Sequence, residues 1–129
     1  MKTILVAEDN LVNREVIREM LEAWGFRVLE APDGQQALLA AKKQRPDLVL
    51  MDIQMPGHDG FSVMRQIRSD AEIKAIPILA LTAYAMRGDS EKALSAGFDG
   101  YITKPIDMEL LRDEITRHLG ASSTAPVAF

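Results

Sequence analysis

The sequence predicts a single α/β domain built on a doubly wound, five-stranded parallel sheet with five helices on its two faces. Five short apolar runs alternate with five segments of helical periodicity, and the connecting loops are short. The runs at 48–51 and 78–81 contain no polar residue, as is typical of strands buried on both faces of a parallel sheet. Right-handed crossovers with helices on both faces favour the strand order 2-1-3-4-5, counted along the chain.

The first half of the chain alternates three predicted strands with two predicted helices. Strands are expected at 3–7, 26–30 and 47–51. The first helix should be capped by Asn10 or Asn13 and should end at Gly25, and the second should follow the turn Asp33-Gly34 and stop before Pro46. The apolar positions that recur at helical spacing in the first helix are Val12, Val16, Ile17, Met20, Leu21 and Trp24.

The second half supplies the remaining two strands and three helices. A turn-rich loop at 52–60 leads into a helix that ends near 69, and a buried strand follows at 78–81. The helix expected at 86–96 has a thin apolar face, so it should be weakly packed. A short strand within 98–103 precedes a last helix that Asp107 caps and Gly120 ends. We therefore expect a folded domain at 1–120 and a flexible tail at 121–129.

Composition narrows the possible functions. The 129 residues suffice for one domain, and the absence of cysteine excludes disulfides and thiolate metal sites. A net charge of −4 argues against binding to nucleic acid. No signal peptide or apolar run of membrane-spanning length is evident, which favours a cytoplasmic protein that does not bind a membrane.

Acidic residues follow two strands that the predicted order makes neighbours. Glu8 and Asp9 end the first strand, and Asp52 ends the third. The carboxyl ends of parallel strands meet at one edge, where ligands bind, so the three carboxylates should converge. Carboxylates in one cleft repel each other unless a cation joins them, and oxygen ligands suit Mg²⁺ rather than zinc. The alternative is that these residues only cap helices or turns.

Two further side chains should lie near the same edge. Thr82 ends the fourth strand and Lys104 ends the fifth. A lysine there is a point charge suited to phosphate, and a threonine hydroxyl can donate to a phosphoryl oxygen. Taken singly, they would be a strand threonine and a surface lysine, and Tyr101 would be a half-buried packing residue. His58 and His118 have no acidic or hydroxyl motif around them and are interpreted as surface residues.

Together these residues resemble the receiver domain of two-component response regulators, in the CheY-like superfamily. The resemblance covers residues 3–119 and implies a flavodoxin-like fold. The segments at 6–10, 51–56 and 81–86 are similar to single-domain regulators of the DivK type and to the receivers of hybrid histidine kinases. The residues that carry the resemblance are Glu8-Asp9, Asp52, Thr82-Ala83, Tyr101 and Lys104-Pro105.

The resemblance implies a function for the acidic cluster. Asp52 would accept a phosphoryl group from a phosphohistidine on a histidine kinase or a histidine phosphotransfer protein. Asp9, Asp52 and the backbone carbonyl of Gln54 would bind Mg²⁺, while Glu8, where many receivers carry aspartate, would act through a metal-bound water. Lys104 would pair with the phosphoryl oxygens. Such a protein is not an enzyme for other substrates; it catalyses only its own phosphorylation and dephosphorylation.

The resemblance also implies a switch. Thr82 would move to hydrogen-bond the phosphoryl group, and Tyr101 would swing inward behind it. The surface formed by the fourth helix, the fifth strand and the fifth helix would then change and control protein partners. The Lys104-Pro105 bond would be cis. The residues that would flank the phosphoryl group are Gln54, Ala83 and Tyr84.

Two other functions fit a similar sheet less well. A phosphatase that forms an aspartyl-phosphate would have Asp-x-Asp, but the second acidic position is Gln54, which cannot transfer a proton at neutral pH. A flavodoxin-like electron carrier would need a Gly/Ser/Thr-rich phosphate loop where Glu8-Asp9 stands. With no room for a DNA-binding output domain, the sequence leaves open a relay intermediate, an effector of a protein target, or a receiver excised from a hybrid kinase.

Overall fold

The sheet has the predicted topology. The computed structural model describes residues 1–55, 60–82 and 89–119. All four neighbouring strand pairs are parallel, and the order is β2-β1-β3-β4-β5. The strands are β1 (Thr3–Ala7), β2 (Arg27–Ala31), β3 (Leu48–Asp52), β4 (Ile78–Thr82) and β5 (Gly100–Thr103). The predicted fold is thus confirmed, with the second and third strands each one residue later than expected.

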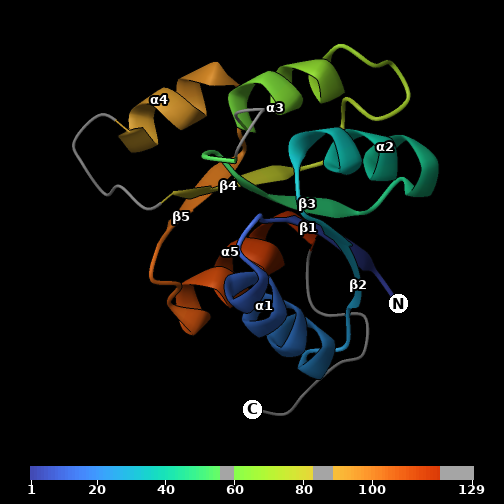
Figure 1. Cartoon of the computed structure of the whole chain (residues 1–129). Helices are drawn as coiled ribbons and strands as arrows, with labels where there is room; N and C mark the ends of the chain where they lie inside the picture. The colour runs from blue at the N-terminus through green and yellow to red at the C-terminus, as the bar shows by residue number, and fades with distance from the viewer. Residues whose placement is uncertain (56–59, 83–88, 120–129) are drawn as a thin grey trace.

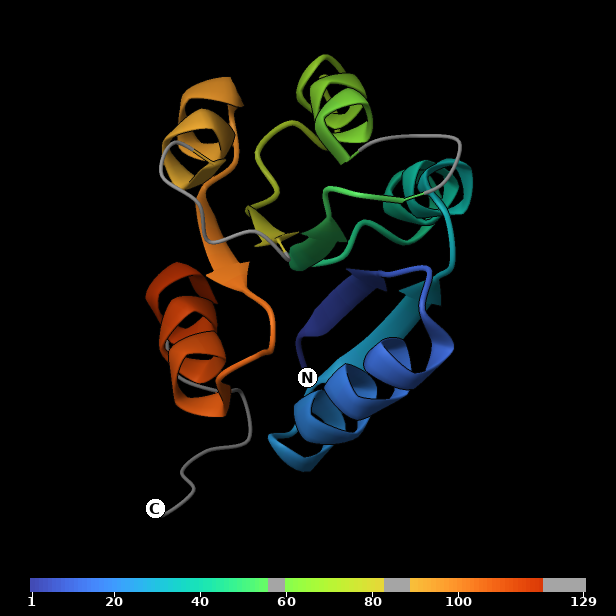
Figure 2. The same ribbon diagram turned by 60° about the vertical axis from the view of Figure 1, so that its left-hand side comes forward.

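Five helices cover the sheet from both sides, as predicted. They are α1 (Leu11–Ala23), α2 (Gly34–Gln44), α3 (Gly60–Arg68), α4 (Asp89–Ala96) and α5 (Met108–Leu119). Figures 1 and 2 show α1 and α5 beneath the sheet and α2, α3 and α4 above it. Each layer encloses its own core. One core joins Ile17 and Leu21 of α1 to Leu111 and Ile115 of α5, and the other lies under α2, α3 and α4.

The helix ends follow the predicted capping. Asn10, rather than Asn13, caps α1, and its side chain accepts from the Asn13 amide at 2.9 Å. Asp33 caps α2 in the same way, and the Asp107 side chain accepts from two amides at the start of α5. Gly25 follows α1 at φ 93°, a left-handed conformation that favours glycine.

Three details of burial differ from the prediction or refine it. In α1 the buried residues are Ile17 and Leu21, whereas Val12 and Val16 are 67% and 45% exposed because they lie to one side of the stripe that faces the sheet. His118 is half-buried beside Glu114, with 3.6 Å between the imidazole Nε2 and a carboxylate oxygen, so it is not a free surface residue. In α4, Ala93 is buried while Leu94 is exposed, which agrees with the thin packing expected there.

Some predicted features lie outside the described residues. These are Ala83, Tyr84 and the predicted first residues of the fourth helix at 86–88, the turn residues 56–59 with His58, and Gly120 with the tail at 121–129. Among the described helices, none has the length and apolar character needed to span a bilayer.

Arg68 joins three segments at the edge of the sheet opposite the acidic cluster. Its guanidinium donates to the carbonyls of Lys74, Ile76 and Gly97 and forms an ion pair with Asp99. The end of α3, the loop before β4 and the loop before β5 therefore share one side chain.

Replacing Arg68 with methionine should lower the free energy of unfolding by about 2–3 kcal/mol, because the carbonyls and the Asp99 carboxylate lose a charged donor. Urea unfolding followed by the fluorescence of Trp24, the single tryptophan, measures the loss. Arg65→Met on the exposed side of the same helix is the matched control. Equal stability of the two variants would contradict the structural role of Arg68.

Candidate functional site

The acidic side chains converge at the carboxyl edge of the sheet. β1 and β3 are hydrogen-bonded neighbours, with Ala7 paired to Met51, so the residues that follow these two positions lie side by side. Carboxylate oxygens of Glu8, Asp9 and Asp52 lie within 4.8 Å of one another. Glu8 is fully buried, Asp52 is nearly so, and Asp9 is exposed. The predicted convergence is confirmed.

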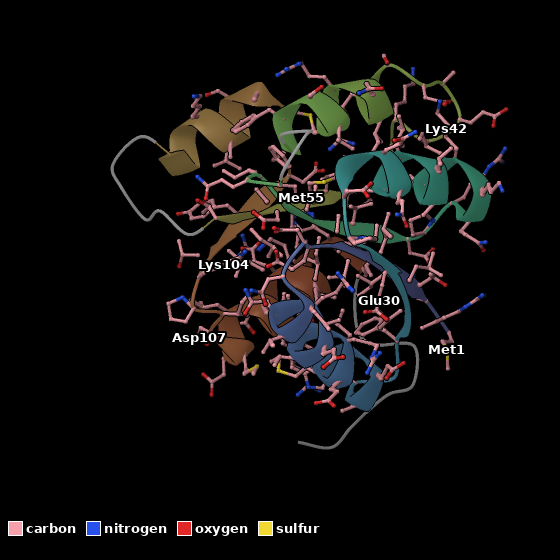
Figure 3. The ribbon with its side chains drawn as sticks, viewed as in Figure 1. Met1, Glu30, Lys42, Met55, Lys104 and Asp107 are labelled. Atoms are coloured by element: carbon pink, nitrogen blue, oxygen red, sulfur yellow. The ribbon has the colours of Figure 1, made fainter. Side chains whose placement is uncertain are left out.

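Lys104 forms ion pairs with both buried carboxylates. Its Nζ lies 2.6 Å from Glu8 Oε1 and 3.0 Å from Asp52 Oδ2. Figure 3 labels this side chain where the chain leaves β5. Partial burial lowers the pKa of Lys104, but the hydrogen bonds and Coulombic attraction from Glu8 and Asp52 outweigh it, so the pKa is raised above its ordinary value. The lysine is therefore charged at neutral pH.

The backbone after β3 fixes the Asp52 carboxylate. The Gln54 amide donates to Asp52 Oδ1 at 2.8 Å, while Oδ2 accepts from Lys104. The Ile53 amide continues the ladder to Leu81 at 3.1 Å. Each carboxylate oxygen has a second lone pair, so these contacts leave acceptor capacity on Asp52 for a cation.

The other predicted side chains occupy the neighbouring strands. Thr82 is buried at the end of β4, one residue beyond the partner of Asp52, and its carbonyl accepts from the Lys104 amide at 2.7 Å. Tyr101 is 38% exposed in β5, so its ring does not lie in the core. The Lys104-Pro105 peptide bond is cis, as the resemblance implied.

The donor set fits a magnesium ion. Three carboxylates supply hard oxygen ligands, and the cluster contains no histidine or cysteine. Mg²⁺ is usually bound by one or two carboxylates and keeps several waters, which suits a site with two buried acids and one exposed acid. The arrangement brings a nearly buried carboxylate, a lysine charge and a metal site into one place, and phosphoryl transfer requires groups of these kinds.

A family model of the response regulator receiver domain matches residues 4–116. The chain belongs to this family. A polar-differentiation response regulator, DivK, from Brucella anthropi is 39% identical over 92% of this chain and 97% of its own length. Receiver domains act in two-component signalling, so this chain is a signalling phosphoacceptor rather than an enzyme for other substrates, and its acidic pocket binds Mg²⁺. Its partner class is a histidine kinase or a phosphotransfer protein.

Solved structures agree with the family assignment. The receiver domain of the sensor histidine kinase PA1611 from Pseudomonas aeruginosa is 42% identical, with a TM-score of 0.85 over 93% of this chain and 98% of that one. That structure has a magnesium ion coordinated in its active-site cleft. The chemotaxis response regulator CheY4 of Vibrio cholerae is 30% identical, with a TM-score of 0.86 over 92% of this chain and 99% of that one.

Two features of the receiver site were missed in the sequence. The first is the direct contact between Glu8 and Lys104, since residues 96 positions apart show no pairing pattern in one sequence. The second is Gly60, where an added Cβ would lie 2.6 Å from the Ile53 Cα and 2.7 Å from the Asp52 carbonyl oxygen. The turn signal at Gly60 was visible, but the close approach to the strand that carries Asp52 was not.

Gly60→Ala should therefore disturb the site. Because the clash is with backbone, the strand end or the start of α3 must shift, at a cost of about 1–3 kcal/mol in unfolding free energy. A small displacement of Asp52 should slow phosphorylation by acetyl phosphate at least about tenfold. Urea unfolding and a phosphorylation time course measure the two effects. Wild-type rates in a folded Gly60→Ala variant would contradict the role assigned to this contact.

Proposed function

We propose that Asp52 is the phosphoacceptor, and that its donor is a phosphohistidine on a histidine kinase or a histidine phosphotransfer protein. The observation that carries this proposal is the pairing of the nearly buried Asp52 carboxylate with Lys104 inside a cluster of three carboxylates. The exposed acid, Asp9, adds negative charge beside this pair, and a bound cation would lower the repulsion within the cluster.

Asp9 and Asp52, with the backbone carbonyl of Gln54, would hold the metal, and Glu8 would contact it through water. When bound, Mg²⁺ supplies positive charge against the phosphoryl oxygens. The support from geometry differs between the acids: Glu8 is committed to Lys104, whereas Asp9 is exposed. Glu8 therefore acts first as the anchor of Lys104 in this proposal.

The transfer itself requires positioning and charge neutralisation more than covalent help. A carboxylate oxygen of Asp52 attacks the phosphorus as the bond from phosphorus to the imidazole nitrogen breaks. The other ring nitrogen of the phosphohistidine carries a proton, so the nitrogen that leaves with the bonding electron pair belongs to a neutral imidazole on the donor. Lys104 stabilises the charge on the phosphoryl oxygens, and the Gln54 amide keeps the carboxylate oriented.

Thr82 and Tyr101 would form the switch. Thr82 ends the strand next to the one that Asp52 ends, and this neighbouring position supports a hydrogen bond from its hydroxyl to a phosphoryl oxygen. Tyr101 is exposed at the edge strand β5, which leaves it free to move towards the space behind Thr82. The responding surface would be α4, β5 and α5, supported by the thin packing of α4. The roles of Gln54, Ala83 and Tyr84 beside the phosphoryl group belong to the same proposal.

A groove next to Lys104 supports a donor protein as the source of the phosphate. It has a volume of about 270 Å³ and opens from Glu8 and Lys104 towards α1 and the start of α5. Apolar side chains next to the phosphohistidine on a donor helix would insert into it. Its remaining lining residues are Asn13, Val16, Ile17, Met20, Pro105, Ile106 and Met108.

Acetyl phosphate with Mg²⁺ tests the proposal directly. Intact mass should show one added phosphoryl group, and EDTA should abolish the addition. A phosphorylated histidine phosphotransfer protein in place of acetyl phosphate should lose its phosphate to the chain under the same conditions. No added mass from either donor, or the same yield in EDTA, would overturn the proposal.

The proposal also includes the boundaries of the receiver domain and the cellular location of the protein. Residues 1–120 would form the receiver and 121–129 a flexible tail, which agrees with α5 ending at Leu119. A cytoplasmic location, where a histidine kinase would present its phosphohistidine, completes it. Output through protein contact would make the chain either a relay intermediate or an effector.

A further inference from the structure

The Arg14 side chain, in the first turn of α1, contacts the backbone of the acidic pocket. Its Nη1 donates to the Glu8 carbonyl oxygen at 2.9 Å, and its Nε donates to Glu30 Oε1 at 3.1 Å. The side chain is only 14% exposed. Arg14 thus spans from the loop after β1 to strand β2, where Figure 3 labels Glu30 between β2 and α1.

The Glu8 backbone is held from both ends. Its amide donates to the Ala31 carbonyl of β2 at 3.0 Å, and its carbonyl accepts from Arg14. That carbonyl belongs to the peptide plane that joins Glu8 to Asp9. Because a peptide is planar, fixing the direction of its oxygen also fixes the nitrogen of Asp9 and restricts where the Asp9 side chain begins.

We propose that Arg14 is a positioning residue for the magnesium site. It does not touch the cation; it orients the peptide between two of the three carboxylates, and Glu30 orients Arg14 in turn. Asp9 is the exposed member of the cluster, so it gains most from a fixed backbone. This inference rests on the proposed magnesium-dependent function of the same pocket.

If Arg14 only attached α1 to β2, its removal would affect Mg²⁺ binding no more than removal of another arginine with that role. Arg18 is such a residue and serves as the control. Arg18, one turn further along α1, pairs with the same Glu30 carboxylate at 3.3 Å and lies 3.8 Å from Glu22. It ties α1 to β2 as Arg14 does, but within the described part of the chain its hydrogen bond and ion pairs go to Glu30 and Glu22, not to the Glu8 carbonyl. If the two arginines only attach the helix to the strand, their removal should affect the pocket equally.

Calorimetric titration of the whole chain with MgCl₂ tests the inference, with thermal unfolding in EDTA as the stability measurement. Arg14→Met should raise the Kd for Mg²⁺ by about tenfold, in the range seen when the support of a metal ligand is removed. Arg18→Met should change the Kd by less than about twofold while losing comparable stability. Arg14→Lys keeps the charge and stem without the planar fork, so its Kd should rise less than that of Arg14→Met.

An unchanged Kd in folded Arg14→Met, or equal rises in Arg14→Met and Arg18→Met, would overturn the inference. If Arg14→Met does not fold, Arg14→Lys decides, because a wild-type Kd in that folded variant would show that the fork is not needed. Failure of the proposed function has a different signature: wild-type protein would bind no Mg²⁺ or accept no phosphoryl group, whatever stands at position 14.

Discussion

Replacing Asp52 with asparagine is expected to abolish phosphoryl addition while leaving the fold intact. The amide has nearly the same shape as the carboxylate, but it is not a nucleophile towards phosphorus. Its carbonyl oxygen can still accept from the Gln54 amide, and Lys104 keeps Glu8 as an ion-pair partner. Intact mass after incubation with acetyl phosphate and Mg²⁺ should show unmodified protein, and circular dichroism should match the wild type.

The matched control is Asp9→Asn in the same cluster. That variant loses a proposed metal ligand but keeps the nucleophile, so its phosphorylation should be slow at low Mg²⁺ and should recover as the Mg²⁺ concentration is raised. Asp52→Asn should not recover at any Mg²⁺ concentration. Phosphorylation of Asp52→Asn with loss in Asp9→Asn would instead place the acceptor at Asp9.

The position of the acidic cluster was predictable because it follows from topology. Apolar runs bounded by turn residues identify the strands, and the doubly wound order places the ends of β1 and β3 side by side. The backbone positions of Glu8, Asp9 and Asp52 are then at the same edge of the sheet. The same reasoning placed Thr82 and Lys104 at the ends of β4 and β5. The order of the strands depends on patterns of many residues. A strand boundary that is wrong by one residue, as for β2 and β3, therefore does not change which side chains lie at this edge.

Contacts that depend on the length and conformation of a single side chain could not be predicted from the sequence. Glu8 meets Lys104 directly because glutamate is long enough and buried, which no spacing rule indicates. Val12 and Val16 have helical spacing but lie to one side of the buried stripe, because periodicity indicates the direction of an apolar face and not its exact width. The contact between the Arg14 guanidinium and the Glu8 carbonyl likewise has no signature in the sequence.

Lys104→Met should produce the second large effect, on both stability and chemistry. In wild-type protein the raised pKa of Lys104 means that its stabilising contribution is complete below the ordinary lysine pKa and is lost only as the pH rises through the raised value. At pH 7 the whole contribution is therefore present. Removing the lysine leaves the Glu8 and Asp52 carboxylates without this charge, at a cost of about 3 kcal/mol in unfolding free energy without Mg²⁺.

Added Mg²⁺ should partly reverse that loss, because in the variant it is the remaining source of positive charge for the cluster and no longer competes with an ammonium. The rise in melting temperature on Mg²⁺ addition should then be larger in Lys104→Met than in wild type. Phosphorylation by acetyl phosphate should remain slower by about a hundredfold even with Mg²⁺ saturating, since the lysine charge on the phosphoryl oxygens is gone. A variant that regains both stability and wild-type rate with Mg²⁺ would show that Lys104 serves only to neutralise the apo pocket. Slow phosphorylation in a restabilised protein would assign it a direct part in the transfer.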